Sequence, residues 1–296
     1  MKKFNLKKVS NSIQQTCFDV DRYITGQPEA DAEFWSKANS IRHAYTILEI
    51  VRYAKKKDKN FLKILNASGL SCGHQDFSIA TFLREQTAIR FKWIAYESPH
   101  SEYLSNDRFK SYISDLQINL RLSDWNQSPG LYGEDSDFDV VIFTEIVEHL
   151  DHSTLLKCLM AIRERMRDDG ILVITTPNSV SLINRIKILL ANGDDLYWGD
   201  GRQNYERGLY GHIAAFDLRR MERLLEDTGY RSCEAFTFTY KPYTFACNRT
   251  SNAIGIIKFT VYRAIDFLSQ FGNTMGRSLF IVAEKCDEAK EIPFQI

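Results

Sequence analysis

The chain has 296 residues, 44% of them apolar, and its 38 basic and 38 acidic side chains cancel to a net charge of zero. This apolar content excludes a disordered chain, and the zero charge provides no overall attraction to nucleic acid or an anionic membrane. Six cysteines without a CxxC pair, the lack of an apolar stretch long enough to span a bilayer and the lack of a signal-peptide pattern predict a cytoplasmic protein without a transmembrane segment.

The pattern of apolar residues predicts an alternation of strands and helices along most of the chain. Strands are expected at 61–66, 91–96, 117–122, 138–143, 171–175, 232–239 and 278–283. Helices are expected at 34–54, 76–85, 102–114, 155–166, 180–191 and 218–227. This order is typical of an α/β protein with a doubly wound, largely parallel sheet, which binds ligands beyond the carboxyl ends of its strands.

Two additions flank the predicted sheet. Residues 1–60 are expected to form a helical N-terminal cap, and residues 61–296 are expected to form the main domain, with a polar lid at 192–211 and an insertion at 241–275. The insertion is mostly apolar, and core packing, a cover over an acceptor, a homodimer contact and contact with a membrane surface all remain open for it. Charge is uneven, because residues 131–151 hold seven acids and no Lys or Arg.

Three segments that follow predicted strands contain residues suited to a nucleoside-like ligand. Small residues at 66–73 would let the backbone approach a ligand, although they match neither GxGxxG nor GxxxxGK[ST]. Glu97 is placed to accept hydrogen bonds from both hydroxyls of a ribose, and Asp124 with Trp125 would suit an adenine. A tight turn, a surface acid and a loop acid beside a core tryptophan are the purely structural alternatives.

The segment after the fourth predicted strand carries two acids and a histidine. If a helix begins there, Glu145, Glu148 and His149 lie at i, i+3 and i+4 on one face, where they could bind a divalent metal. Acids in a first helical turn also interact favourably with the helix dipole, so a structural role stays open. His212 follows the polar lid, where a hydrogen-bonding role competes with a ligand role.

The order of these signals resembles the class I S-adenosylmethionine (SAM)-dependent methyltransferases over residues 61–285. The most specific segments are FDVVIFTEIVEHLDH (138–152), RMRDDGILVITTPN (165–178) and GHIAAFDLRRMERLLEDTGY (211–230). The resemblance implies that the main domain, 61–296, is a class I methyltransferase domain with a Rossmann-like, seven-stranded mixed sheet in which 278–283 is an antiparallel strand near one edge.

The resemblance also implies roles for individual residues. The family usually has an acid followed by GxGxG in the first loop, and this chain departs from that pattern because Asn66 replaces the acid. The residues that the resemblance assigns to SAM are Gly69, Ser71 and Gly73 for the amino-acid half, Glu97 for the ribose, Asp124 and Trp125 for the adenine, and Thr144 for the methionine moiety.

A narrower resemblance concerns the ExxEH pattern. The ubiquinone-biosynthesis O-methyltransferases and the small-RNA 3′-terminal 2′-O-methyltransferases of the family carry it, and the RNA enzymes add a later histidine to bind a divalent ion. Glu145, Glu148, His149 and His212 are similar to that set and imply Mg²⁺ or another divalent cation. Glu145, His149 and His212 are then the expected catalytic residues, with a histidine acting as general base if no metal binds.

Three functions follow from these observations. The favoured one is methyl transfer to a hydroxyl of a small molecule or glycan. An RNA-terminal methyltransferase fits the ExxEH pattern, but the zero net charge argues against nucleic acid as a partner. A non-catalytic protein that uses the fold for binding or assembly would explain the altered first loop. The missing GxGxxG argues against a nicotinamide-dependent dehydrogenase.

Overall fold

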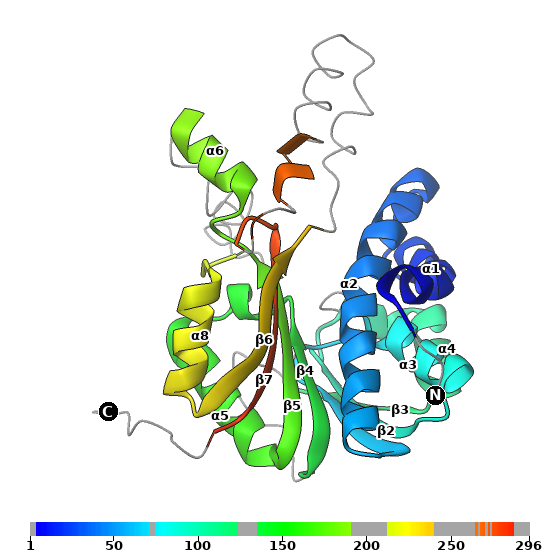
Figure 1. Ribbon diagram of the computed structural model, residues 1–296. Coiled ribbons are helices and arrows are strands. Elements are labelled where there is room, and N and C mark those ends of the chain that lie inside the picture. Colours follow the sequence, from blue (N-terminus) through cyan, green and yellow to red (C-terminus); the bar gives the residue numbers. More distant parts are fainter. Residues whose placement is uncertain are drawn as a thin grey trace. The chain divides into compact units, whose positions relative to one another are not determined.

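The computed structural model describes residues 4–70, 75–123, 135–190, 212–239, 264–265, 267–269, 272 and 274–286 (Figure 1). The predicted lid at 192–211 lies outside these residues, as does most of the insertion at 241–275. No helix in the described segments is long and apolar enough to cross a membrane.

The described strands form one seven-stranded sheet in the order β3-β2-β1-β4-β5-β7-β6. Strand β1 pairs in parallel with both β2 and β4, β2 pairs in parallel with β3, and β6 pairs antiparallel with β7. The strands span Phe61–Asn66 (β1), Arg90–Glu97 (β2), Ile118–Leu122 (β3), Phe138–Thr144 (β4), Met166–Pro177 (β5), Tyr230–Phe238 (β6) and Ser278–Lys285 (β7). The mixed Rossmann-like sheet expected from the sequence, with an antiparallel strand inserted near one edge, is therefore confirmed.

Two compact units divide the chain. The first comprises Met1–Thr144 with Leu156–Val173, and the second comprises Glu145–Leu155 with Ile174–Ile296. Strand β4, which is buried along its whole length, ends the first segment of the first unit at Thr144, and the first segment of the second unit begins at the next residue.

Helices of the N-terminal half belong to the first unit. They are α1 (Leu6–Tyr23), α2 (Glu29–Lys56), α3 (Gln75–Gln86), the 3₁₀ helix η1 (Glu102–Ser105) and α4 (Asp107–Asp115). Helices α1, α2 and α3 pack against one another through an apolar layer that includes Val9, Ile13, Ile47 and Ile50 (Figure 1). The single helix expected at 102–114 is wrong, because the Asn106 side chain accepts hydrogen bonds from the N–H groups of Arg108 and Phe109 and starts α4 anew.

Beyond Thr144 the named helices of the described segments are a 3₁₀ turn η2 (Val147–His149), α5 (His152–Arg165), α6 (Leu182–Leu190) and α8 (Leu218–Asp227). Helix α8 packs on β6 (Figure 1). Strand β5 begins at Met166, five residues before the expected start at Ile171, because Gly170 continues the strand instead of ending the preceding helix. A Cβ atom at Gly170 would lie 2.8 Å from the carbonyl oxygen of Phe138, so the close approach of β4 requires glycine there.

Candidate functional site

The loop after β1 is held by a network of short polar contacts. The N–H of Ser68 donates to Asn66 Oδ1 at 2.8 Å, and Asn66 Nδ2 donates to the Asp76 carboxylate at 2.5 Å. Gly69 has a φ of +94°, a conformation that glycine adopts without strain, and the next N–H, that of Leu70, donates to Tyr96 O at 2.9 Å. Asn66, at the position of the family's usual acid, thus pairs with an acid on α3. Ser71 and Gly73, which the resemblance assigns to SAM, lie outside the described residues.

Asp76 is fully buried, and burial raises its pKa to about 7 against the opposing effect of hydrogen bonds from Trp93 and Asn66. Trp93 Nε1 donates to one carboxylate oxygen at 2.6 Å, and Asn66 donates to the other. Sequence reasoning missed this acid, because at the start of a predicted helix it reads as a surface residue that favours the helix dipole.

The first residue of α3, Gln75, is a second buried polar residue that was not among the predicted site residues. Its Nε2 donates to the hydroxyl of Thr144, and its buried Oε1 accepts no hydrogen bond from any described residue. A buried carbonyl oxygen without a donor carries a desolvation cost that a ligand N–H or ammonium group would remove. Gln75 therefore fits a ligand that carries such a donor.

The ends of β2 and β4 hold the other predicted cofactor residues in the described part of the chain. Glu97 closes β2, is 1% exposed, and accepts a hydrogen bond from the N–H of Ser98 at 2.9 Å. Thr144 closes β4, and its N–H donates to Ser68 Oγ at 2.6 Å. Because β1, β2 and β4 are parallel neighbours, these residues share one edge of the sheet. Asp124 and Trp125 lie outside the described residues.

The acid-and-histidine segment follows Thr144 in the chain and belongs to the second unit. The condition that a helix begins at Glu145 is not met, because Glu145 has a φ of +54° and only the 3₁₀ turn Val147–His149 follows it. Left-handed backbone at a non-glycine residue costs about 1–2 kcal/mol, and strain of this kind concentrates at functional sites. The Glu145 N–H donates to Thr175 O at 2.8 Å, and the Thr175 hydroxyl donates to the Glu145 carboxylate at 2.9 Å.

Three of the four predicted metal ligands lie together, although they do not share the face of an α-helix. One ligand atom from each of Glu148, His149 and His212 lies within 4.8 Å of the other two, and Glu145 is not part of this group. The rings of His149 and His212 meet edge to face with centroids 4.8 Å apart, and Glu148 Oε1 lies 4.0 Å from His149 Nε2. A carboxylate and two imidazoles suit a borderline divalent cation, so the donor set fits a metal.

Hydrogen bonds from two further segments fix this cluster. Glu148 is 3% exposed, and the Thr176 hydroxyl at the end of β5 donates to its Oε2 at 2.9 Å. The N–H groups of Ile213 and Ala214 donate to the main-chain oxygen of Glu148 at 2.8 and 3.1 Å and so hold the residues that follow His212 against η2. Sequence reasoning assigned no role to Thr175 and Thr176, since a hydroxyl at the end of a strand of β-branched residues gives no separate signal in the sequence.

The seven-stranded mixed sheet, with polar side chains at the carboxyl ends of β1, β2 and β4, defines an α/β fold of the Rossmann-like methyltransferase class. The family model described as a methyltransferase domain matches residues 45–234. The chain belongs to this methyltransferase-domain family. The match supports SAM-dependent methyl transfer as the activity without specifying the acceptor.

Several solved structures are similar to the chain, whereas no curated protein sequence matches it. A SAM-dependent methyltransferase from Archaeoglobus fulgidus is 17% identical with a TM-score of 0.45, over 82% of this chain and 94% of the other. A putative sarcosine dimethylglycine methyltransferase from Galdieria sulphuraria is 12% identical with a TM-score of 0.49, over 90% and 89%. The magnesium protoporphyrin IX methyltransferase from Synechocystis with bound S-adenosylhomocysteine (SAH) is 14% identical with a TM-score of 0.47, over 95% of this chain and 100% of the other.

Proposed function

We propose that the chain transfers a methyl group from SAM to a hydroxyl of a small molecule or glycan with the help of a divalent cation. The observation that carries the proposal is the cluster of Glu148, His149 and His212, which begins four residues after the strand-end Thr144. A group that can bind a metal or accept a proton is what a hydroxyl acceptor requires, because the hydroxyl must lose its proton as the methyl group arrives.

Residues of the first unit would hold the cofactor. The Glu97 carboxylate would accept hydrogen bonds from the ribose hydroxyls. Gln75 Oε1, which lacks a donor among the described residues, would accept a hydrogen bond from the ammonium group of SAM. Gly69 would line the amino-acid half, and Thr144, which accepts from Gln75, would lie beside the methionine moiety. Bound SAM supplies a methyl carbon that its sulfonium already activates, so these residues need mainly to position it.

Residues of the second unit would act on the acceptor. Glu148, His149 and His212 would bind the cation, while Thr176 keeps the Glu148 carboxylate oriented. A cation bound there lowers the pKa of a coordinated hydroxyl. Without a cation, the imidazole of His149 or His212 would accept the proton directly. Glu145, whose carboxylate accepts a hydrogen bond from Thr175, would shape the turn that presents the cluster.

Titration with Mn²⁺ tests the cation separately from the acceptor. The metal-free chain should bind one Mn²⁺ in calorimetry, and His149→Ala and Glu148→Gln should each weaken binding at least tenfold because each removes one of three ligands. His100→Ala, at an exposed histidine in the first unit, is the matched control and should bind as the wild type does.

Activity provides the second readout. Tritiated SAM with a panel of phenols, catechols and oligosaccharides should yield an O-methylated product, and EDTA should abolish its formation. Absence of Mn²⁺ binding together with full activity in EDTA would contradict the proposal that a divalent cation assists the reaction. His149 or His212 would then remain as the general base. A product methylated on nitrogen would contradict hydroxyl transfer.

A further inference from the structure

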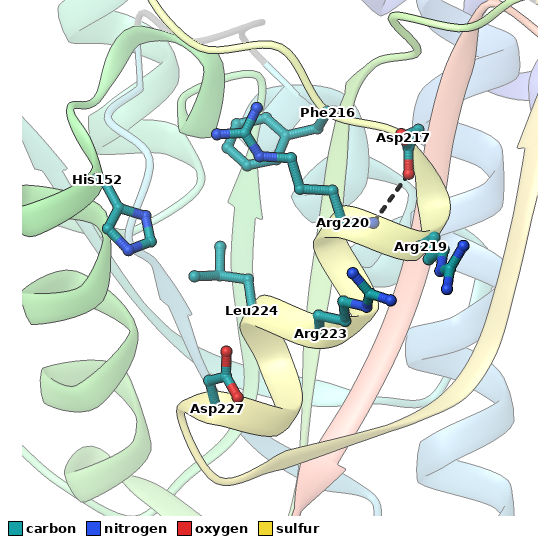
Figure 2. A pocket seen from close by; sticks show the side chains of 8 residues that line it. All are labelled: His152, Phe216, Asp217, Arg219, Arg220, Arg223, Leu224 and Asp227. Carbon is teal, nitrogen blue, oxygen red and sulfur yellow. Dashed lines mark hydrogen bonds between the residues drawn. The ribbon is translucent and has the colours of Figure 1, made fainter. Parts of the chain in front are cut away.

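A cavity of about 400 Å³ lies in the second unit between the start of α5 and helix α8 (Figure 2). Its lining includes Arg219, Arg220 and Arg223 from α8 and His152 from α5. Sequence reasoning assigned no role to these four residues. The volume falls within the range of small-molecule sites, and no step of the proposed methyl transfer uses the cavity.

The guanidinium groups of this cavity are only partly engaged by the protein. Arg220 Nη1 donates to Ala215 O at 2.7 Å, and its guanidinium carbon lies 5.1 Å from the centre of the Phe216 ring, which fixes its orientation. Arg219 and Arg223 are exposed, and neither forms a hydrogen bond or ion pair with another residue in the described segments through its guanidinium. Like charges at i and i+4 destabilise a helix by about 0.2–0.5 kcal/mol, so these two arginines do not stabilise α8 by themselves.

The acids of the cavity do not neutralise these arginines. The Asp217 carboxylate caps α8 and accepts a hydrogen bond from the Arg220 N–H at 2.9 Å. Asp227 is the last residue of α8, and Figure 2 shows it at the far end of the cavity from Phe216. The lining of the cavity therefore contains three guanidinium groups and two carboxylates, so its positive charges outnumber its negative ones. The dipole at the N-terminus of α8 adds positive potential.

Two chain segments connect the cavity to the cluster of Glu148, His149 and His212. His152 lies three residues after His149, and Phe216 lies four residues after His212. The two segments are tied together, because the N–H groups of Ile213 and Ala214 donate to Glu148 O. A ligand bound in the cavity would thus contact the segments that carry the proposed catalytic groups.

We infer that the cavity binds a phosphate group of the methyl acceptor, so that the substrate is a small phosphorylated molecule whose hydroxyl is presented to the Glu148, His149 and His212 cluster. Guanidinium groups match the oxygens of a phosphate in bidentate geometry, and two of them are available here without breaking an ion pair. The inference rests on the proposed function for the identity of the acceptor, whereas phosphate binding stands on the cavity alone.

Calorimetric titration with phenyl phosphate and with inorganic phosphate tests the inference on the full chain. The wild type should bind one equivalent of each, and the double variant Arg219→Gln/Arg223→Gln should bind at least tenfold more weakly. The control is Arg90→Gln, which removes an exposed arginine of the first unit that has no side-chain partner among the described residues. The double variant should keep wild-type affinity for SAH and for Mn²⁺.

Each contrary outcome has a defined meaning. Equal phosphate binding by the double variant and the wild type would overturn the inference, as would benzoate binding as tightly as phenyl phosphate. A single-stranded RNA without terminal phosphates that binds more tightly than phenyl phosphate would also overturn it in favour of a nucleic-acid surface. Failure of SAH binding with phosphate binding intact would contradict the proposed function and leave the phosphate site standing.

Discussion

Gln75 joins the first loop to the end of β4. Its amide nitrogen binds the Thr144 hydroxyl, and Asp76 beside it accepts hydrogen bonds from Asn66 and Trp93. These buried polar groups lie where the proposed cofactor would bind, and their arrangement depends on contacts that no local sequence pattern reveals. The acid expected at the end of β1 is absent, and a buried acid ten residues later supports the same loop.

Replacement of Gln75 tests its proposed contact with the cofactor. Gln75→Leu should weaken SAH binding about tenfold, because it removes the buried carbonyl oxygen that would accept a hydrogen bond from the ammonium group of the ligand. Loss of about 1.4 kcal/mol of binding free energy corresponds to a tenfold weaker affinity. Gln86→Leu, at the exposed end of the same helix, is the control. Equal SAH affinity in Gln75→Leu and the control, measured by calorimetry, would exclude the contact.

Asp76 makes stability depend on pH. Its pKa rises from 3.8 to about 7 on folding, so the folded chain holds the proton more tightly and the group favours folding most below about pH 4. That contribution falls as the pH rises through about 7, and Asp21, whose pKa burial raises to about 6, acts in the same direction.

Urea unfolding at pH 5, 6, 7 and 8 measures this dependence. Asp76→Asn should flatten the fall in the free energy of unfolding between pH 5 and 8, because the side chain no longer ionises. Asp107→Asn, at a carboxylate that is 100% exposed, should leave the fall unchanged. A slope in Asp76→Asn as steep as that of the wild type would show that Asp76 does not titrate in this range.

At the scale of elements, a buried histidine joins the N-terminal helices to α3. His43 Nδ1 lies 2.7 Å from Ser78 Oγ, Ser78 Oγ donates to Gln75 O at 2.9 Å, and Arg42 Nη2 lies 3.3 Å from His43 Nε2. Since Arg42 can only donate, Nε2 accepts and Nδ1 carries the proton, which makes His43 a neutral bridge between α2 and α3. Helix α2 is therefore connected to the residue that begins the proposed cofactor site.

Loss of this bridge should destabilise the fold. His43→Ala should lower the free energy of unfolding by about 2 kcal/mol, because it removes a buried side chain together with its hydrogen bonds to Ser78 and Arg42. His100→Ala, at an exposed site, should change it by less than about 0.5 kcal/mol. Denaturation in urea distinguishes the two, and an effect of His43→Ala as small as that of the control would contradict the bridge.

The elements also show which parts of the molecule sequence patterns could predict. Strands β1, β2 and β4 were predictable because they are largely buried apolar runs. The positions of Glu97 and Thr144 could be predicted with them, because each residue ends its strand. The turn at Glu145 was not predictable, since its left-handed backbone is imposed by the contacts with Thr175. Glu148, His149 and His212 lie together through hydrogen bonds between distant segments, which periodicity cannot show.

For the whole molecule, charge is unevenly distributed along the chain. The net charge is zero, yet the acids at 131–151 include Glu145 and Glu148, and the arginines of α8 line a separate cavity. Carboxylates at the proposed reaction centre suit a cationic sulfonium and a metal ion, and the arginines suit an anionic acceptor. A neutral chain can therefore attract ligands of opposite charge to different places.

Isothermal titration calorimetry of SAH with the full chain tests whether this chain binds the methyltransferase cofactor. We expect saturable binding of one equivalent and at least tenfold weaker binding by Glu97→Gln, because the buried Glu97 carboxylate would accept hydrogen bonds from both ribose hydroxyls. Glu85→Gln, at an exposed position on α3, should bind as the wild type does. No binding by the wild type would contradict the proposed cofactor, and equal binding by Glu97→Gln and the wild type would contradict the role of Glu97 at the ribose.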